Sequence, residues 1–318
     1  MRFHSRRWPA AAVLAAAALL AAACGAPASP GTASSPAGRP VASGSFPVSI
    51  AAAGSVVRIA ARPAAIVSLS PTATEMLYAI GAGPQVKAVD SLSDYPPGAP
   101  VTKLAAFQPN VEAIVAYKPD LVITSNDTGL AKKLAAFSVP VLNLPAPAAV
   151  AGEYAEFREL GQATGDVAGA QREIAALRAG IARIVAAVPH RARPLSYYYE
   201  LDQTYYSVTS ATFVGSLLRM LGMKSIADSA SGAASAGGYP KLSPEFVVRA
   251  NPDYIILADT VCCHQSAATV AARPGWSTLS AVKDGHVITL NDDIASRWGP
   301  RVASLMQAVE TGISKGTK

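Results

Sequence analysis

The stretch at residues 112–123, EAIVAYKPDLVI, recurs 133 positions later as EFVVRANPDYII at residues 245–256. In each copy an acidic residue opens an apolar helical turn, a Pro-Asp pair breaks the helix, and an apolar run suited to a buried strand follows. A weaker pair precedes the two copies, SLSPTATEMLYAIG at 68–81 and TSATFVGSLLRMLG at 209–222. A chain that repeats the same series of strands and helices is expected to build two similar lobes with a cleft between them.

Strands and helices alternate around both copies, which predicts an α/β fold with parallel sheets. In the first half the expected strands lie at residues 56–59, 66–69, 86–90, 121–124 and 141–144, and the expected helices at 71–80, 110–117 and 130–137. In the second half the expected strands lie at 195–200, 254–257 and 286–290, and the expected helices at 213–221, 244–249, 275–279 and from 301 onward. Ser70 is the expected N-cap of the first helix and Pro71 its first residue.

Between the two halves, residues 149–188 are expected to be helical. Gly161 and Gly165 interrupt this segment, which predicts a short helix to about residue 164 and a long one from 166. The long helix spans about 23 residues, or roughly 35 Å, enough to bridge two lobes. Its apolar face carries Ile174, Leu177, Ile181 and Ile184. The expected organisation is a signal peptide at 1–23, a linker at 24–47, an N-terminal lobe at 48–147, bridging helices at 148–190 and a C-terminal lobe at 191–318.

The N-terminus has the pattern of an export signal. Three arginines within the first seven residues precede a short apolar stretch at 8–23, which ends in small residues before Cys24 and is too short to span a membrane. The arrangement resembles a bacterial lipoprotein signal, in which the cysteine is acylated, and residues 25–47 have the composition of a flexible tether. We therefore expect the protein on the extracytoplasmic face of the cell membrane, anchored by lipid on Cys24. Ordinary secretion, with Cys24 free or lost, is the alternative.

The charge distribution argues against nucleic acid as a partner. The formal net charge is +6, three of these charges lie in the expected signal, and no run of five Lys or Arg residues occurs. Catalysis has little support, because the sequence contains no Gly-x-Ser-x-Gly, His-Glu-x-x-His or Gly-x-x-x-x-Gly-Lys motif. We expect neither enzymatic activity nor a cofactor. An enzyme with an unrecognised site is a rival class.

Cys262 and Cys263 are adjacent in the sequence. An exported protein meets an oxidising compartment, so the two thiols are expected to close a vicinal disulfide. An unlinked pair and a soft-metal site with His264 are the alternatives. The metal reading is the weakest, because three consecutive residues cannot surround a tetrahedral ion and the long-range spacing of a zinc site is missing.

Aromatic and small polar residues gather at the ends of the expected strands, where ligands of open parallel sheets bind. Large flat faces combined with a few directional polar groups suit a bulky, partly apolar ligand. For Phe107 and Tyr206 a place in the core of a lobe is an equal alternative. The expected ligand-binding residues are Ser70, Tyr95, Phe107, Asn126, Tyr205, Tyr239, Asp293 and Arg297.

Several motifs resemble those of the substrate-binding lipoproteins of bacterial ABC importers, in the group that binds cobalamin, ferric siderophores and haem. The similarity runs from about residue 62 to residue 309. The motifs are IVSLSP at 66–71 with Thr74-Glu75, SDYPP at 93–97, IV at 114–115 with KPDLVI at 118–123, and Ser296-Arg297 with Pro300-Arg301. The resemblance implies two Rossmann-like lobes joined by a long helix, with the ligand bound in the cleft between them.

The resemblance also implies roles for single residues. Glu112 and Glu245 match the family's docking glutamates, one on each lobe, which meet arginines of the two permease subunits. The simpler explanation is that acidic residues favour the positive end of a helix. Tyr95, Asp293 and Arg297 match pocket residues of cobalamin-binding members.

Two of the matches bear on the choice of ligand. Tyr239 lies where cobalamin-binding members have an aromatic residue, whereas Phe107 and Ser125 stand where those members have tryptophan. The tyrosines are an alternative set for contacting a siderophore or ligating haem iron: Tyr95, Tyr197, Tyr198, Tyr199, Tyr205, Tyr206 and Tyr239.

The sequence therefore predicts a membrane-tethered receptor that captures a ferric siderophore or a corrinoid and delivers it to the permease subunits of an importer. Its partners are the permease, the small-molecule ligand and, through the lipid anchor, the membrane. The alternative is a haem- or metal-binding lipoprotein or chaperone that uses tyrosines or the Cys262, Cys263 and His264 cluster.

Overall fold

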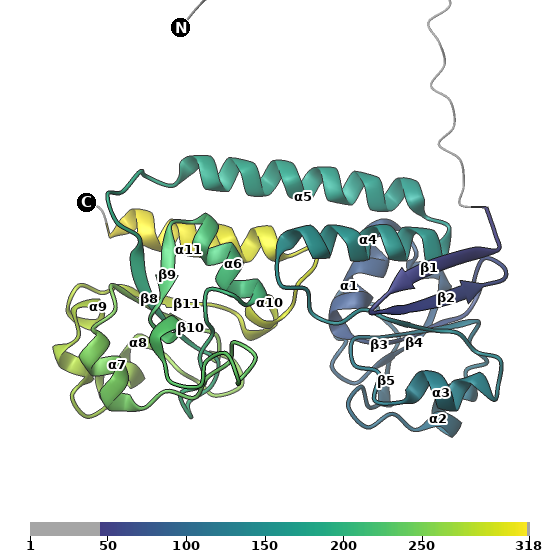
Figure 1. Ribbon diagram of the computed structural model, residues 1–318, viewed down its shortest axis with the longest axis horizontal. Helices are drawn as coiled ribbons and strands as arrows, with labels where there is room; N and C mark the ends of the chain where they lie inside the picture. The colour runs from purple at the N-terminus through teal and green to yellow at the C-terminus, as the bar shows by residue number, and fades with distance from the viewer. Residues whose placement is uncertain (1–44, 317–318) are drawn as a thin grey trace, which may run out of the picture. The chain divides into compact units, whose positions relative to one another are not determined.

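The computed structural model describes residues 45–316, and Figure 1 labels their helices and strands. The expected signal peptide, Cys24 and most of the linker lie outside the described residues. The described part begins with a hairpin, in which β1 (Val48–Ala52) pairs antiparallel with β2 (Ser55–Ile59). None of the helices within residues 45–316 combines the length and apolar character needed to cross a bilayer.

The N-terminal lobe contains a five-stranded parallel sheet in the order β5-β4-β3-β6-β7. Its helices are α1, α2 and α3, with the short 3-10 turn η1 (Gly83–Gln85) before β4. The strands are β3 (Ile66–Leu69), β4 (Val86–Asp90), β5 (Val101–Leu104), β6 (Leu121–Thr124) and β7 (Val141–Asn143), and the helices α1 (Pro71–Ile80), α2 (Val111–Val115) and α3 (Leu130–Ala135).

The C-terminal lobe contains a four-stranded parallel sheet in the order β11-β10-β8-β9. The strands are β8 (Leu195–Glu200), β9 (Met223–Ser225), β10 (Tyr254–Leu257) and β11 (Val287–Thr289). The helices are α6 (Phe213–Met220), α7 (Pro244–Ala250), α8 (Ala267–Ala271), α9 (Ser280–Lys283), α10 (Asp292–Ser296) and α11 (Val302–Lys315), with 3-10 turns η2 (Ile226–Ser229) and η3 (Trp276–Thr278). The α/β fold with parallel sheets predicted from the sequence is confirmed.

The two sheets share one topology, as the repeat predicts. The order β4-β3-β6-β7 in the first lobe corresponds to β9-β8-β10-β11 in the second. Lys118, three residues after the end of α2, and Asn251, the residue that caps α7, lie 133 positions apart and both have the left-handed conformation, with φ of 49° and 42°. The Pro-Asp pairs that follow therefore mark a helix-to-strand corner that both lobes build in the same way.

The aspartate of each Pro-Asp pair ties this corner to the start of the central strand. Asp120 Oδ2 accepts hydrogen bonds from the backbone N–H groups of Ala64 and Ala65, at 2.8 and 2.9 Å. Asp253 Oδ2 accepts from the backbone N–H of Ser196 at 2.7 Å. The repeated Pro-Asp pair has a structural role, because it satisfies backbone donors that would otherwise lack a partner.

Alternate residues along each strand pack against different helices, so each sheet is covered on both faces. In β3, Ile66 belongs to a core cluster shared with α1 and the bridging helices, whereas Val67 and Leu69 belong to a second cluster with α2 and α3. The C-terminal sheet is divided in the same way between a face that contacts α6 and α11 and a face that contacts α7 and α8.

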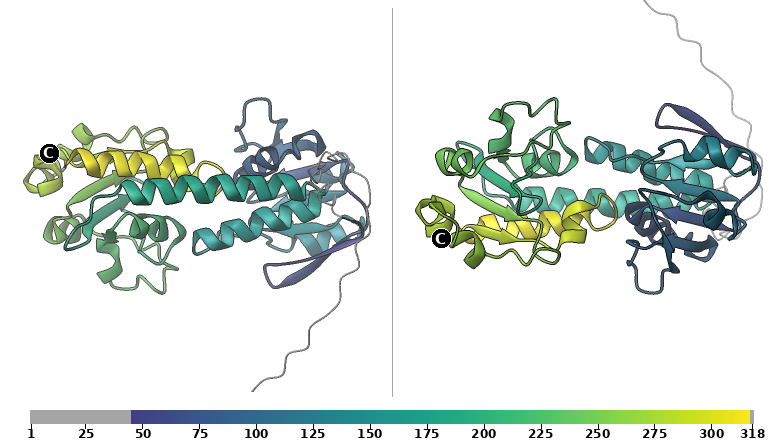
Figure 2. Two further views of the ribbon diagram at one scale, coloured as in Figure 1. Left: turned by 90° about the horizontal axis from the view of Figure 1, so that it is seen from above. Right: turned by 90° about the horizontal axis from the view of Figure 1, so that it is seen from below.

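The bridging segment forms α4 (Val150–Thr164) and α5 (Val167–Ala187), close to the expected limits. The apolar face expected from the sequence is buried in one core cluster with residues of both lobes, and α5 contacts α1 as well as α11. Figures 1 and 2 show α5 beside α4 and beside the yellow α11. Gly169 permits the contact with α1, because a Cβ at this position would collide with the Ile80 carbonyl.

Six helices and strands of the described residues were not predicted, namely β1, β5, β9, α8, α9 and α10. Each is three to five residues long, too short to show a helical or strand period. The omission of α10 matters most, because this helix carries Asp293 and is followed directly by Arg297.

Candidate ligand-binding site

Most of the predicted ligand-binding residues lie in loops that leave the carboxyl ends of the parallel strands. Tyr95 follows β4, Phe107 follows β5 and Asn126 follows β6 in the first lobe, and Asp293 follows β11 in the second. The carboxyl ends of parallel strands lie at one edge of their sheet, which is where open α/β sheets bind ligands. The fold therefore gathers these residues at one edge of each lobe.

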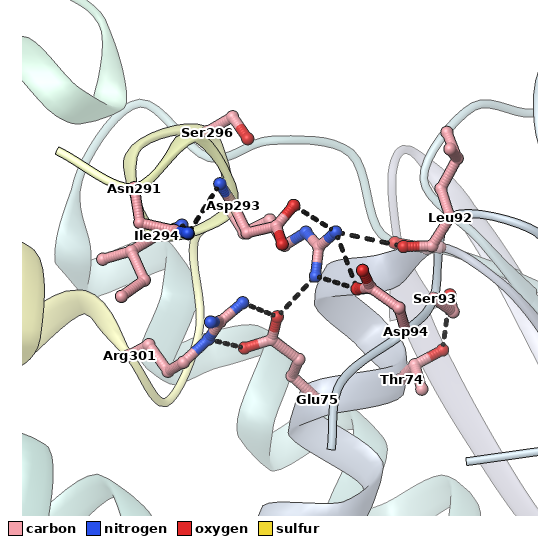
Figure 3. Close-up of polar contacts among 12 residues, drawn as sticks. Thr74, Glu75, Leu92, Ser93, Asp94, Asn291, Asp293, Ile294, Ser296 and Arg301 are labelled. Atoms are coloured by element: carbon pink, nitrogen blue, oxygen red, sulfur yellow. Dashed lines mark hydrogen bonds and ion pairs between the residues drawn. The ribbon is translucent and has the colours of Figure 1, made fainter. Parts of the chain in front are cut away.

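At this edge the two lobes are joined by ion pairs centred on Glu75 of α1, drawn in Figure 3. The Glu75 carboxylate is 2% exposed and accepts hydrogen bonds from two arginines of the C-terminal lobe. Arg301 Nε donates to Oε2 at 2.8 Å, and Arg297 Nη1 donates to Oε1 at 3.1 Å. One buried carboxylate thus holds two guanidinium groups from the other lobe.

The two terminal nitrogens of Arg297 also bind other protein acceptors. Its Nη2 donates to Asp293 Oδ1 at 2.6 Å and to the Leu92 carbonyl at 3.0 Å, and Nη1 also contacts Asp94 Oδ1 at 3.2 Å. The Arg297 side chain is only 12% exposed. A ligand anion would therefore have to displace protein carboxylates to reach the terminal nitrogens of this residue, which the sequence predicted to bind the ligand.

Three aromatic residues at this edge keep a large exposed surface. Tyr95 is 40% exposed and lies beneath the Arg301 guanidinium, 4.3 Å from its ring centre. Tyr239 is 41% exposed, and its partial burial raises the pKa of its hydroxyl. Phe107 is 72% exposed, so the structure does not place it in the core of its lobe. Tyr95 thus offers a flat apolar face beside the ion-paired centre, and Tyr239 and Phe107 offer exposed rings in other loops.

Two of the predicted ligand residues make contacts within the C-terminal or N-terminal lobe itself. Ser70 is buried, and its Oγ accepts the backbone N–H of Ala73 as the N-cap of α1. Tyr205 is half-buried and packs beside Trp276, with ring centres 5.9 Å apart. Because the Ser70 hydroxyl is buried and caps a helix, the ligand assignment of Ser70 does not agree with the structure, whereas that of the half-buried Tyr205 stays a prediction. Asn126 is exposed, with its backbone N–H bonded to Thr124 Oγ1.

The tyrosines of β8 are wrong as candidates for contacting a siderophore or haem. Tyr197, Tyr198 and Tyr199 are fully buried because β8 is a central strand with both faces covered. Cys262 and Cys263 form a disulfide, so their sulfur atoms are not thiolates available to a metal. Within the described residues, no group of three His, Cys, Asp or Glu side chains is arranged to hold a metal ion.

Two acids of α4 lie buried beside the segment that follows Arg297. Glu156 Oε2 accepts a hydrogen bond from Trp298 Nε1 at 2.6 Å. Burial raises the pKa of Glu156 to about 8, although the Trp298 hydrogen bond acts in the opposite direction. Burial, reinforced by the Glu156 charge, raises the pKa of Glu153 to about 9. At neutral pH both side chains are therefore mainly protonated.

These pKa shifts predict a protein that loses stability as the pH rises. Above their ordinary pKa of 4.5 the two acids ionise in the unfolded chain, whereas the folded protein keeps their protons until about pH 8 to 9. Stability should fall across this window and level off above it. Replacing both with glutamine should flatten the slope and raise the free energy of unfolding at pH 8 by about 2 kcal/mol.

Urea unfolding between pH 5 and pH 9 measures this effect. The exposed Asp284 gives a matched control, because Asp284→Asn removes a surface carboxylate of the same chain. Glu156→Gln keeps an oxygen that can accept from Trp298 Nε1. A slope that is the same in the double variant and in Asp284→Asn would show that the two acids are not held protonated.

Glu112 and Glu245 are exposed in the first turns of α2 and α7. Hydrogen bonds from its own backbone N–H and from Ser243 lower the pKa of Glu245. In each lobe this helix packs on the sheet face opposite the one covered by α5, as Figure 1 shows. The two carboxylates are thus presented to solvent by equivalent helices, away from the bridging helix.

Sequence reasoning missed the central roles of Glu75 and Arg301, although both lie in the motifs that suggested the family. The available signal was a charged residue in the middle of an otherwise apolar helical stretch, ATEMLYAI. A buried charge requires a partner of opposite charge, but its identity does not follow from the local pattern.

Comparison with known proteins gives consistent results. A family model described as periplasmic binding protein matches residues 66–294. The chain is 30% identical over 276 residues to the uncharacterized ABC transporter substrate-binding lipoprotein YvrC of Bacillus subtilis, covering 83% of this chain and 84% of that protein. It is 31% identical over 259 residues to the vitamin B12-binding protein of Pectobacterium atrosepticum, covering 78% of this chain and 87% of the relative.

Solved structures share the fold. The periplasmic vitamin B12 binding protein BtuF of Vibrio cholerae superimposes with a TM-score of 0.67 at 23% identity, covering 81% of this chain and 99% of that one. At this identity the likeness extends to the arrangement of strands and helices, and it covers both lobes.

Proposed function

Since the chain belongs to the periplasmic binding protein family, we propose that it captures a corrinoid outside the cell and delivers it to the permease subunits of an ABC importer. The relatives named for vitamin B12 support this ligand class, and the substrate-binding lipoprotein of Bacillus subtilis supports the importer role. By the same likeness, Cys24 is proposed to carry the lipid that holds the protein on the membrane.

The charge balance around Tyr95 is the observation that carries the choice of ligand. Three carboxylates, those of Glu75, Asp94 and Asp293, surround the guanidinium groups of Arg297 and Arg301. The positive charge of both arginines is already compensated, and the cluster has a formal charge of −1. Such a site repels an anion and favours a neutral or cationic ligand.

The net negative charge of this cluster favours some of the possible ligands over others. Haem carries two propionates and ferric tris-catecholates carry several negative charges, so both would meet uncompensated carboxylates. Cyanocobalamin is neutral, has a broad conjugated ring and is fringed with amides. Its ring can contact the exposed faces of Tyr95, Tyr239 and Phe107, and its amides can bond the polar groups beside them.

The bridging helix bears on how the ligand is held. Because α5 is buried against helices of both lobes, large movements of one lobe relative to the other would expose part of a shared core. Affinity is therefore proposed to come mostly from a preformed surface, with little closure on binding.

Ligand titration tests the proposal. The purified protein should bind cyanocobalamin with a Kd below about 10 μM, measured by fluorescence quenching, and should bind hemin and a ferric tris-catecholate at least tenfold more weakly. Tyr95→Ala should weaken cobalamin binding about 10- to 100-fold, or about 1.5–3 kcal/mol, through the loss of an aromatic contact.

Tyr117 offers a matched control for Tyr95. It is also 40% exposed, but it precedes β6 and so lies at the opposite edge of the sheet. Tyr117→Ala should leave affinity unchanged. Tighter binding of hemin or the catecholate would reject the corrinoid, and an equal loss in both tyrosine variants would reject the site.

A further inference from the structure

The loop that follows β10 carries the vicinal disulfide and is the repeat counterpart of a predicted ligand loop. Asn126, which follows β6, corresponds to Asp259 at the repeat distance of 133 residues. Residues 258–266 therefore leave the C-terminal sheet at the same carboxyl edge that carries the candidate ligand residues. The sequence predicted a disulfide between Cys262 and Cys263, with an unlinked pair or a metal site as the alternatives, and assigned them no contact with the ligand.

Hydrogen bonds fasten this loop to the helix that carries Asp293. The carboxylate of Asp292 accepts the backbone N–H groups of Val261 and Cys262, at 2.9 and 2.7 Å. Thr260 Oγ1 donates to the Leu290 carbonyl at 2.6 Å. Asp292 is the first residue of α10, so the same helix holds the disulfide loop and carries the Asp293–Arg297 ion pair.

The other end of the loop is held by a buried ion pair. Arg273 donates to both oxygens of Glu200, each at 2.6 Å, and to Gln265 Oε1 at 2.7 Å. Gln265 Nε2 in turn donates to the Cys263 carbonyl at 3.1 Å. Because both ends of the loop are fixed, its tip has a defined position before any ligand arrives.

The tip itself is apolar and faces solvent. Val261 is 58% exposed and Cys262 is exposed, while the backbone N–H groups of both are occupied by Asp292. The disulfide removes two thiol groups and leaves two polarizable sulfur atoms on the residues that follow Val261 in the chain. An apolar tip held by polar contacts at its base suits the ring or methyl groups of a large ligand, not a hydrated ion.

We propose that the tip formed by Val261, Cys262 and Cys263 is a ligand-contacting element of the C-terminal lobe that packs against the apolar part of a corrinoid. This proposal rests on the proposed function, because it assigns a further contact surface to the same ligand. In this contact the disulfide keeps the two sulfur atoms close together, so that they form a compact, uncharged surface.

The test compares cobalamin affinity in variants of the tip. Replacing Cys262→Ser together with Cys263→Ser should weaken cyanocobalamin binding about tenfold, because two hydroxyls replace the sulfur pair and the tip is no longer fixed. Lys283 and Asp284 are adjacent exposed residues before β11, at the opposite sheet edge. Replacing both with serine is the matched control and should leave affinity unchanged.

A second variant covers the case in which the serine pair impairs folding. Val261→Asn changes an exposed side chain, keeps the disulfide and should lower affinity at least threefold at an unchanged Tm. Affinity equal to wild type in this variant, or in a folded serine pair, would overturn the proposal alone. Failure of the wild-type protein to bind cobalamin would instead reject the proposed function and this contact with it.

Discussion

Replacing Glu75 with alanine should lower the free energy of unfolding by about 3–5 kcal/mol. This carboxylate is 2% exposed and is the shared partner of Arg297 and Arg301, whose side chains are 12% and 19% exposed. Removing it takes from the poorly hydrated Arg301 guanidinium the carboxylate that it binds and from Arg297 its buried partner, and such a loss of one partner is strongly destabilising. Urea unfolding at pH 7 measures the effect.

Asp94 provides a matched control within the same network. It also contacts Arg297, at 3.2 Å, but its side chain is 63% exposed. Asp94→Ala should therefore cost less than about 1 kcal/mol, because solvent screens an exposed ion pair. Equal losses of stability in the two variants would show that burial of the Glu75 carboxylate does not determine the strength of this junction.

Replacing both Glu112 and Glu245 with alanine should abolish uptake of the ligand while leaving its affinity unchanged. Each carboxylate is proposed to pair with an arginine of one permease subunit, and truncating one partner of such a pair costs about 2–5 kcal/mol when the pair is desolvated. Loss of both pairs would weaken docking at least a thousandfold. Both residues are exposed on helices outside the candidate ligand site, so binding should be preserved.

Uptake of labelled cobalamin by cells that depend on this protein, together with titration of the purified variant, measures the two quantities separately. Asp284→Ala removes an exposed carboxylate at another place on the C-terminal lobe and is the control. Normal uptake by the double variant would discard the docking role. A loss of ligand affinity would place the glutamates in the binding site instead.

Much of the fold follows from local features of the sequence. The repeat predicts two similar lobes because the same order of caps, breaks and apolar runs gives the same local structure twice. The left-handed conformation of Lys118 and Asn251 and the hydrogen bonds of Asp120 and Asp253 explain why both copies keep their spacing. The bridging helix follows from one apolar face at helical period, since burial of that face requires neighbours along its length.

The candidate site was predicted only in outline. Strand ends locate the loops, so the sequence placed Tyr95 and Asp293 beyond the carboxyl ends of their strands, where the structure has them. That they bind the ligand stays a prediction. The same reasoning named Ser70 both as the N-cap of α1, which the structure confirms, and as a ligand residue, although the capping hydroxyl is buried. It also kept the tyrosines of β8 as possible ligand contacts. In a strand that is buried on both faces, the sequence shows no alternation of polar and apolar residues that would separate buried from exposed side chains.

The sequence by itself determined the two lobes, the bridging helix and the exposed glutamates, because these depend on contacts between near neighbours and on hydrophobic period. The tertiary structure alone decided the polar centre of the site. Arg297 and Arg301 meet Glu75 across 222 and 226 residues of chain, and Asp292 meets Cys262 across 30. Such pairs depend on how the helices and strands pack against each other. A buried charge needs a partner, and the packing decides which residues lie close enough to be that partner.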